Sequence, residues 1–500
     1  MVTRKLCLGN NTELTDQQTR KLAAEQGTIC HGLLSELDGE IANYSVDGFY
    51  HSSVYDIMPG RLREICLDIG HVIVLPQTKS DYQDPESFYQ TVQLCKQLET
   101  TITVEWLDPE IKNTNQFFEQ LVNTNSSFCI YPFIELLVQN GSTTVCCRSS
   151  NPVTELSQLK DYGTDPGYTA IRDKMLQGVR VPEHCSACYK LENVGITSPR
   201  KQETIEWANR LGLNGLEDLQ QITQPVYYEI RPSNICNLQC RMCSPTYSHL
   251  IDQEYQQLGL SAPIKIDHTG FDIVDINNVN KLYVAGGEPM AMPDFYEFVD
   301  QCIDTHNTDF EFVINTNGTK LSDRFKRQLQ HFSRMQFIVS IDGADRLNHY
   351  IRWPSNWSTI VDNVTYLVTN NYYVTFNVTV SMYNVLDLNN LFRFFEQHWP
   401  RQAVHLQLAG SRDDYLSAFN HPSSDLVVHM LTQSQQTATY RDNALVANFV
   451  DTMLAHYKNN HQCDLVKLKK FFEINDKLDQ SRNIYLEDYL PDLSNARSMI

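Results

Sequence analysis

The sequence predicts an α/β protein built around a partial barrel of six β/α units, a (β/α)6-type barrel. Six short runs with the character of buried or half-buried strands recur along the chain, and segments with helical spacing separate several of them. A complete eight-fold barrel takes about 250 residues, whereas these runs occupy only residues 226–408, so we expect an open barrel. The runs are Val226–Ile230, Leu282–Ala285, Phe310–Ile314, Gln336–Ile341, Thr375–Ser381 and His405–Leu408.

Further segments flank this core. Residues 1–122 alternate strand-like runs at Leu6–Leu8, Val72–Leu75 and Thr101–Val104 with helical spacing at Thr15–Glu25 and Glu86–Leu98, which predicts a small α/β domain of unknown role. Residues 123–222 are less regular and rich in cysteine, so we expect a separate module there. The core then covers residues 223–414. Residues 415–500 have helical spacing, as in Ala444–Tyr457 and Leu465–Phe472, and predict a helical C-terminal cap.

The composition restricts location and partners. Sixty acidic residues against forty basic ones give a net charge of −20, which argues against non-specific nucleic-acid binding. The N-terminal residues have no apolar signal core, and no stretch has the roughly 18 apolar residues that span a bilayer. We therefore expect a cytoplasmic protein without a membrane partner.

Eight of the fourteen cysteines fall into tight groups. A disulfide framework is typical of small secreted proteins, whereas grouped cysteines in a large chain without an export signal indicate metal or iron–sulfur binding. Cys236, Cys240 and Cys243 directly follow the first predicted barrel strand. Three thiolates leave one iron of a [4Fe–4S] cluster open, since such clusters normally have four cysteine ligands. The alternative is a zinc site in which His249 completes the ligand set.

The next three predicted strands also end in polar or glycine-rich segments. Gly286, Gly287 and Glu288 precede a proline after the second strand, and Asn315-Thr316-Asn317-Gly318 ends the third. Ser340-Ile341-Asp342-Gly343 ends the fourth, and Arg352 follows. Glycine lets the backbone approach a ligand closely, and a guanidinium suits a carboxylate. Each segment alone is an ordinary turn, but all lie where barrel active sites lie.

Taken in this order, the motifs resemble the radical S-adenosylmethionine (SAM) superfamily, in its branch with auxiliary-cluster domains. The resemblance implies that Cys236, Cys240 and Cys243 bind a catalytic [4Fe–4S] cluster. It implies a reductant such as flavodoxin or ferredoxin, cleavage of SAM to a 5′-deoxyadenosyl radical, and hydrogen abstraction from a substrate. It also implies SAM contacts from Gly286, Gly287, Glu288, Ser340 and Arg352.

Two further SAM contacts follow from the resemblance. Asn384 follows the fifth strand and faces the nucleoside in this interpretation, although a strand-end asparagine is commonly only a cap. Met242 stands where relatives often have an aromatic residue, and its polarizable sulfur can pack on adenine.

An upstream cysteine set resembles the ligands of twitch or SPASM-type auxiliary domains. The resemblance implies a second [4Fe–4S] cluster on Cys129, Cys146, Cys185 and Cys188, with Cys147 as the rival of Cys146. In relatives this domain follows the barrel, whereas here the cysteines precede it. A four-cysteine zinc site is the alternative, for which the Cys185-x2-Cys188 spacing is typical.

Three functions remain open from the sequence. The first is a radical SAM enzyme that modifies a peptide or protein, as many auxiliary-cluster relatives do. The second is the same chemistry on a small-molecule metabolite. The third is a non-enzymatic iron–sulfur or zinc protein, which would bind metal without turning over SAM.

Overall fold

The computed structural model describes residues 116–149, 151–193, 197–410, 414–459 and 461–500, together with the backbone of five short strands between residues 4 and 106. The chain divides into two compact units. The first contains residues 1–134, 145–151 and 161–224, and the second contains residues 135–144, 152–160 and 225–500. The four-segment division expected from the sequence stays a prediction.

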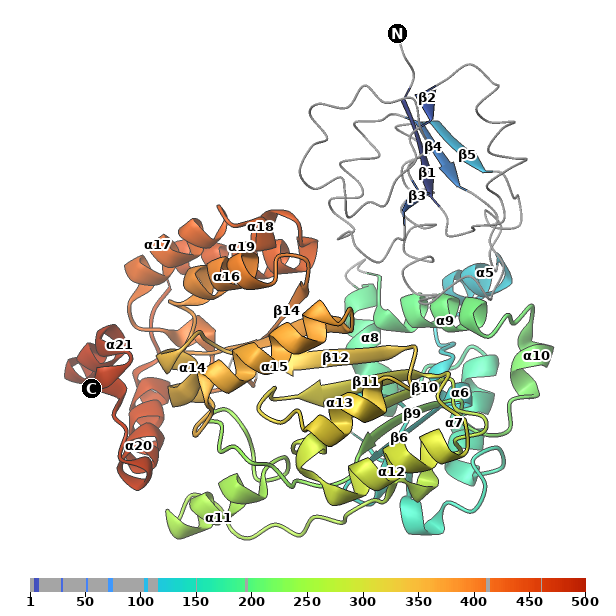
Figure 1. Ribbon diagram of the computed structural model, residues 1–500, viewed down its shortest axis with the longest axis horizontal. Helices are drawn as coiled ribbons and strands as arrows, with labels where there is room; N and C mark the ends of the chain where they lie inside the picture. The colour runs from blue at the N-terminus through green and yellow to red at the C-terminus, as the bar shows by residue number, and fades with distance from the viewer. Residues whose placement is uncertain are drawn as a thin grey trace. The chain divides into compact units, whose positions relative to one another are not determined.

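A nine-stranded sheet forms the centre of the second unit, in the order β14-β13-β12-β11-β10-β9-β6-β7-β8 (Figure 1). Strands β9 to β14 are parallel to one another and lie at the six positions predicted from the sequence. Their bounds are Tyr227–Arg231 (β9), Lys281–Val284 (β10), Glu311–Thr316 (β11), Met335–Ser340 (β12), Tyr373–Val380 (β13) and Ala403–Leu408 (β14). The parallel α/β core is thus confirmed.

Three strands from the predicted cysteine module extend this sheet. They are β6 (Glu135–Gln139), β7 (Ser142–Thr144) and β8 (Thr154–Glu155). β6 pairs with β9 in parallel, whereas β7 and β8 add on as antiparallel strands. β6 is buried over its first four residues, Glu135 and the apolar Leu136, Leu137 and Val138, which suits a strand inside a sheet rather than at its edge.

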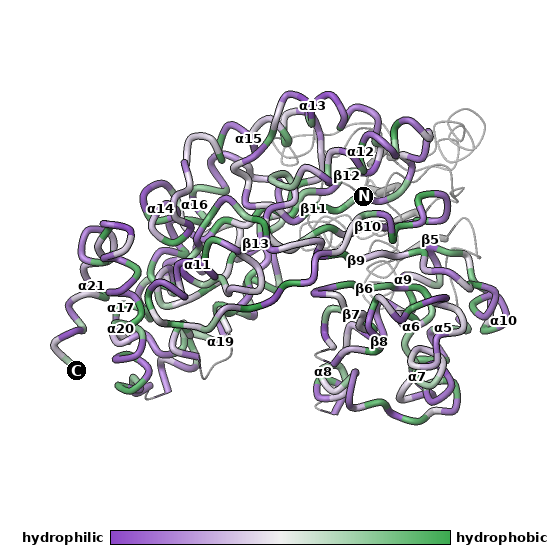
Figure 2. Tube along the Cα trace, turned by 90° about the horizontal axis from the view of Figure 1, so that it is seen from below, coloured by the Kyte–Doolittle hydropathy of each residue, from purple (hydrophilic) through white to green (hydrophobic). Residues whose placement is uncertain are grey.

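One face of the sheet is apolar and lies under helices. Figure 1 shows α12 (Pro293–Asp304), α13 (Asp323–Leu329) and α15 (Trp357–Thr369) along this face, and α16 (Leu388–His398) packs there as well. Aromatic contacts join the layers: Phe376 of β13 stacks on Phe395 of α16 with ring centroids 4.4 Å apart. β10 and β12 bury every second side chain, whereas β9 and β11 are each buried over their first four residues. Figure 2 shows the trace coloured by hydropathy, with both hydrophobic and hydrophilic stretches along it.

The opposite face of the same sheet is polar. The strand register places alternate residues of neighbouring strands side by side, so that Ser340, Asn377 and His405 form one row across β12 to β14. On the same face, at the N-terminal ends of β10 and β11, Nζ of Lys281 lies 2.8 Å from Oε1 of Glu311. Several polar residues of this face are nevertheless buried, among them Glu229, Glu311 and Thr375.

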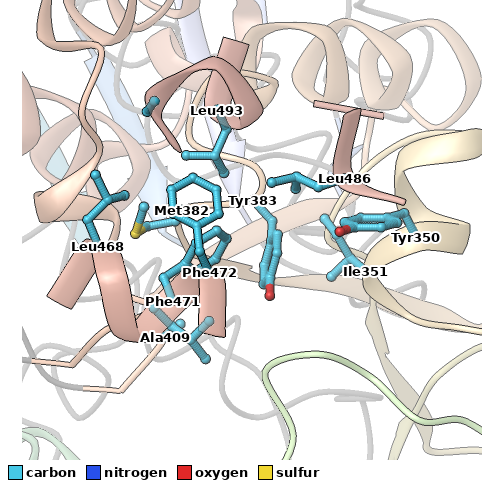
Figure 3. Close-up of a cluster of buried hydrophobic side chains, with 12 residues drawn as sticks. Tyr350, Ile351, Met382, Tyr383, Ala409, Leu468, Phe471, Phe472, Leu486 and Leu493 are labelled. Atoms are coloured by element: carbon cyan, nitrogen blue, oxygen red, sulfur yellow. The ribbon is translucent and has the colours of Figure 1, made fainter. Parts of the chain in front are cut away.

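Helices follow the barrel strands to the C-terminus, as predicted. They are α17 (Ser424–Ser434), α18 (Ala438–Arg441), α19 (Ala444–Lys458), α20 (Leu465–Arg482) and α21 (Pro491–Asn495). Phe471 and Phe472 of α20 join a buried hydrophobic cluster with Tyr350 and Ile351, which end the helix after β12, and with Tyr383, which follows β13 (Figure 3). Helix α20 thus shares a core with the segments that follow these two strands.

The first unit has its own parallel sheet, in the order β2-β1-β4-β5, with β3 also paired to β1. The strands are β1 (Arg4–Leu8), β2 (Thr28–Ile29), β3 (His51–Ser52), β4 (His71–Val74) and β5 (Thr103–Trp106). The three predicted strand runs agree with β1, β4 and β5, whereas the helices predicted at Thr15–Glu25 and Glu86–Leu98 lie outside the described residues. Downstream helices are α5 (Gln116–Thr124), α7 (Pro166–Leu176), α8 (Pro182–Asn193), α9 (Pro199–Arg210) and α10 (Leu216–Gln220). In the described part of the chain, no helix has the length and apolar character needed to cross a bilayer.

Candidate active site

The three cysteines of the predicted catalytic motif lie on the loop between β9 and α11 (His249–Gln257), and all three thiols are free. We call residues 232–248 the cysteine loop. Its backbone is anchored at the C-terminal end of α14 (Arg346–Ile351) and just beyond it: the Arg241 amide donates to the carbonyl of Ile351 at 2.8 Å, and the Gln239 amide donates to that of Trp353 at 2.6 Å. The loop lies at the C-terminal end of β9, as expected for a barrel active site.

The three thiols are close enough to influence one another. Burial raises the pKa of Cys236 to about 12, and the neighbouring Cys240 raises it further. Burial also raises the pKa of Cys243, with added repulsion from Cys240 and Cys236. A raised pKa favours the protonated thiol, and metal binding has to displace that proton.

His249 is held by the backbone of the cysteine loop. The Cys236 amide donates to Nδ1 of His249 at 3.2 Å, and the His249 amide donates to the Asn234 carbonyl at 2.8 Å. This nitrogen thus supports the loop, and the structure adds no support to His249 as a zinc ligand. Among the described residues, no three Cys, His, Asp or Glu side chains converge as a single metal ion requires.

The glycine pair after β10 packs against the cysteine loop. The Gly287 amide donates to Ser233 at 3.0 Å, and the Glu288 amide donates to Ile235 at 2.7 Å. A Cβ atom on Gly287 would lie 1.9 Å from the Ile235 carbonyl oxygen, so only glycine fits there. Gly286 has a φ of +113°, which also favours glycine. The pair therefore lets the loop lie directly on the end of β10.

Glu288 is fully buried, and both of its carboxylate oxygens accept hydrogen bonds from the chain. Oε1 accepts from Thr316 Oγ1 at 2.8 Å, and Oε2 accepts from the Asn317 amide at 2.7 Å. Burial raises the pKa of Glu288 to about 7, although these donors act in the opposite direction. Glu288 thus joins the ends of β10 and β11, and its contact with SAM stays a prediction.

Arg352 connects the end of β12 to the cysteine loop. Its Nε lies 2.5 Å from Oδ2 of Asp342, and its Nη1 lies 3.9 Å from Sγ of Cys240. Asp342 is fully buried and also accepts the Thr379 amide at 2.7 Å. Asp342 belongs to the segment Ser340-Ile341-Asp342-Gly343, and its own role was not predicted from the sequence. In the structure, its carboxylate orients the guanidinium of Arg352.

Three cysteines on a strand-end loop, a glycine pair beneath them and a buried arginine beside one thiol agree with the resemblance described above. The Radical SAM superfamily model matches residues 230–394. These residues form a radical SAM domain. The predicted resemblance is confirmed for this part of the chain, and the family implies a [4Fe–4S] cluster and SAM as cofactors.

Individual relatives match the chain only in part. An AdoMet-dependent heme synthase from Methanosarcina barkeri is 24% identical over 168 residues, which are 32% of this chain and 44% of that protein. The solved structure of native anSMEcpe with bound AdoMet is 18% identical, covers 42% of this chain and 60% of that one, and has a TM-score of 0.33. Streptococcus suis SuiB bound to precursor peptide SuiA is 14% identical, covers 66% and 63%, and has a TM-score of 0.30. The chain thus spans less than two thirds of each of these relatives.

The remaining predicted SAM contacts lie around the strand ends of the radical SAM domain. Ser340 is half-buried, and its hydroxyl donates to Asn315 Oδ1 at 3.3 Å. Asn384 is buried, donates to the Asp342 carbonyl at 2.8 Å and accepts the Ser381 amide at 2.7 Å. These bonds close the turn after β13, which is the alternative role considered for Asn384. Met242 is partly buried and packs against the cluster shown in Figure 3.

The upstream cysteines all belong to the first unit. Cys129 and Cys188 are buried, Cys185 and Cys146 are half-buried, and Cys147 is exposed. Burial raises the pKa of Cys129, with added repulsion from Cys185 and Cys188, so these three thiols are neighbours. Burial likewise raises the pKa of Cys185 to about 11.

Two polar contacts hold the surroundings of these cysteines. Ser149, close after Cys146 and Cys147, contacts Nδ1 of His184 on α8 at 3.3 Å, and α8 also carries Cys185 and Cys188. On the other side, the buried Arg200 of α9 donates to the Phe128 carbonyl beside Cys129. The structure therefore brings Cys129, Cys185 and Cys188 together and ties the loop of Cys146 and Cys147 to the same helix.

Proposed function

We propose that this chain is a radical SAM enzyme that reductively cleaves SAM at a [4Fe–4S] cluster bound by Cys236, Cys240 and Cys243, and abstracts hydrogen from a peptide or protein substrate. The observation that carries the proposal is the cysteine loop itself. Three thiols lie together at the end of a parallel strand inside a segment that matches the radical SAM family. When bound, a cluster with one open iron supplies the electron that cleaves SAM to methionine and a 5′-deoxyadenosyl radical.

The residues around the thiols support this assignment. Arg352 places a positive charge beside Cys240, which favours a thiolate there, as ligation requires. The guanidinium also suits the carboxylate of SAM, because it can donate paired hydrogen bonds. The glycine pair at Gly286 and Gly287 allows the loop to lie close against β10, where polar backbone groups can orient SAM.

The polar face of the sheet is the proposed place of the substrate. Ser340, Asn377 and His405 lie in one row on this face, on the last three parallel strands. Side chains that can donate and accept hydrogen bonds suit a substrate with peptide or other polar groups. A radical that forms at the strand ends would be close to this row.

The peptide or protein substrate rests on the resemblance to auxiliary-cluster enzymes, with a flavodoxin or ferredoxin as reductant. A small-molecule metabolite is the second candidate, and the partial match to a protein named as a heme synthase favours it. Unlabelled SAM, combined in separate reactions with peptides or with metabolites from cells grown in deuterated medium, distinguishes the two. The fraction that contains the substrate transfers deuterium to 5′-deoxyadenosine, and the other fraction does not.

The experiment that tests the enzyme assignment is anaerobic reconstitution followed by reduction with dithionite and addition of SAM. We expect 5′-deoxyadenosine from the wild-type chain and none above background from the Cys236→Ala/Cys240→Ala/Cys243→Ala variant. Production by the triple variant would refute the assignment of the ligands. A wild-type chain that takes up neither cluster nor SAM would favour the zinc or non-enzymatic alternative.

We further propose a second [4Fe–4S] cluster in the first unit, on Cys129, Cys146, Cys185 and Cys188. Four thiolates would close the site, which suits electron transfer or structural support. The proximity of Cys129, Cys185 and Cys188 supports three of these ligands. Cys146 is favoured over Cys147 as the fourth, because Cys147 is exposed whereas Cys146 is half-buried.

A further inference from the structure

The C-terminal helix α20 reaches into the cysteine loop of the radical SAM domain. Arg241, between the predicted ligands Cys240 and Cys243, is 1% exposed and points toward α20. Its Nη2 lies 2.6 Å from Oδ1 of Asp479, and its Nη1 donates to Oδ1 of Asn475 at 2.9 Å. Two residues of one helix thus hold the side chain of a residue that stands between two predicted ligands in the sequence.

The other partners of Arg241 make its position more specific. Its Nε donates to the Tyr350 carbonyl at 2.8 Å, and its guanidinium carbon lies 3.7 Å from the centre of the Tyr350 ring. The Tyr350 and Tyr383 hydroxyls complete the network: Tyr350 donates to Asp479 at 3.0 Å and Tyr383 donates to Asn475 at 3.0 Å. Figure 3 labels both tyrosines together with Phe471 and Phe472 of α20. Every group in this network is buried.

A second buried pair joins α20 to the helix that directly follows the cysteine loop. Arg482 donates through Nε and Nη2 to both carboxylate oxygens of Glu254 on α11, at 2.9 and 2.6 Å. The side chains are 1% and 6% exposed. The helix therefore holds the segment of the cysteine loop and α11 at two points, one of them inside the motif.

We propose that α20 is a positioning element for the cluster ligands, and that Asp479 and Asn475 hold Arg241 so that Cys240 and Cys243 keep their ligating conformation. This inference rests on the proposed function. Its physical argument is that a buried ion pair adds little stability compared with well-packed apolar side chains of similar volume. What a guanidinium adds is direction, because its donors form a rigid planar fork.

Two variants remove the contact between Arg241 and Asp479 in different ways. Asp479→Asn keeps an acceptor for the Leu486 amide, which bonds to Asp479 at 2.8 Å, but leaves the Arg241 charge unpaired. Arg241→Met/Asp479→Asn leaves no unpaired charge, so the fold is retained while the directional contact is lost. Asp476→Asn is the matched control, since Asp476 is on the same helix but pairs with the part-exposed Arg497 at 2.7 Å.

The first measurement is hydrogen exchange of residues 236–243 in the metal-free protein, with strands β10 to β13 as the internal reference. The second is iron release from reconstituted protein to a chelator. Groups that hold a metal ligand in place typically contribute about 10- to 100-fold to metal affinity. We therefore expect iron release about 10-fold faster in both test variants, with faster exchange confined to the cysteine loop. Asp476→Asn should behave as wild type.

Two results would overturn the inference. One is a double variant whose hydrogen exchange in the cysteine loop and whose rate of iron release both equal those of Asp476→Asn. The other is faster exchange spread evenly over the reference strands, which would make the contacts purely structural. A wild-type chain without iron would refute the proposed function instead, and the exchange measurement would still decide whether α20 orders the loop.

Discussion

Arg352 and Asp342 form a buried ion pair within the radical SAM domain, with Nε of the arginine 2.5 Å from Oδ2 of the aspartate. The Asp342 side chain is fully buried and that of Arg352 is 11% exposed. Because the same guanidinium lies 3.9 Å from Cys240 Sγ, the pair sets the position of a positive charge beside a predicted cluster ligand. Asp342 is thus a positioning residue, and Arg352 is the group expected to contact SAM.

Asp342→Asn should lower the free energy of unfolding of the metal-free chain by about 3–5 kcal/mol, because it leaves a buried arginine without its counter-charge. Urea denaturation measures this change. Asp300→Asn is the control: Asp300 pairs with Arg324, and both side chains are about half exposed, so the cost should be about 0–1 kcal/mol. Equal costs for the two variants would contradict the importance of the buried pair.

Gly287→Ala should prevent normal cluster loading. The added Cβ would lie 1.9 Å from the Ile235 carbonyl oxygen, so the cysteine loop must move away from β10. The measurement is iron and the visible absorbance of the cluster after anaerobic reconstitution. Gly215→Ala is the control, because a Cβ there meets no atom within 4 Å. Full loading of Gly287→Ala would show that ligation does not depend on this close packing.

The auxiliary site predicts a specific iron count. Two [4Fe–4S] clusters correspond to about eight irons per chain, and Cys185→Ala/Cys188→Ala should leave about four. Cys146→Ala should lose iron in the same way, whereas Cys147→Ala should retain it because the Cys147 thiol is exposed. About four irons and one zinc in the wild-type chain would identify the upstream site as zinc.

The stability of the second unit should fall in acid because of His421. Burial lowers the pKa of this fully buried histidine from 6.5 to about 3, with a smaller effect from His461. Between these two values the unfolded chain binds more protons than the folded chain, so the free energy of unfolding decreases as the pH falls below 6.5. This one group contributes a slope of roughly 1.4 kcal/mol per pH unit at most.

His421→Asn tests this expectation by urea denaturation between pH 4 and pH 7. Asparagine keeps an acceptor for the Ser423 amide, which bonds to Nδ1 of His421 at 3.2 Å, but it cannot bind the proton. The pH dependence of stability should be flatter in this variant than in His429→Asn, which replaces an exposed histidine. An unchanged slope would mean that other groups cause the acid sensitivity.

Much of the candidate site could be predicted because its parts are local in sequence. The three cysteines lie within eight residues, and the Gly-Gly-Glu segment and the Ser340 segment each directly follow a strand. Parallel strands bring their C-terminal ends to one edge, so these segments meet whatever the details of packing. The sequence indicated that position 287 needs a glycine, but only the structure shows why. The Ile235 carbonyl of the cysteine loop lies where a Cβ atom would be.

Other features depend on contacts between residues far apart in the chain. Nothing in the sequence indicated that Arg241 would meet Asp479, or that β6 would pair with β9 in the central sheet. Helices α19 and α20 were expected from their periodicity, but the contact of α20 with Arg241 of the cysteine loop was not. Side chains such as Glu288 and Asn384 were expected to face SAM, and their hydrogen bonds within the chain became visible only in the folded structure.

By itself, the sequence determined the strands of the core, the helical character of the C-terminal region and the three-cysteine motif, because periodicity and spacing are properties of neighbouring residues. The tertiary structure alone decided which buried charges are paired, as in Asp342 with Arg352 and Asp479 with Arg241. A buried charge requires a partner at a defined distance and orientation. Those partners come from different elements, so they are fixed only when the elements pack together.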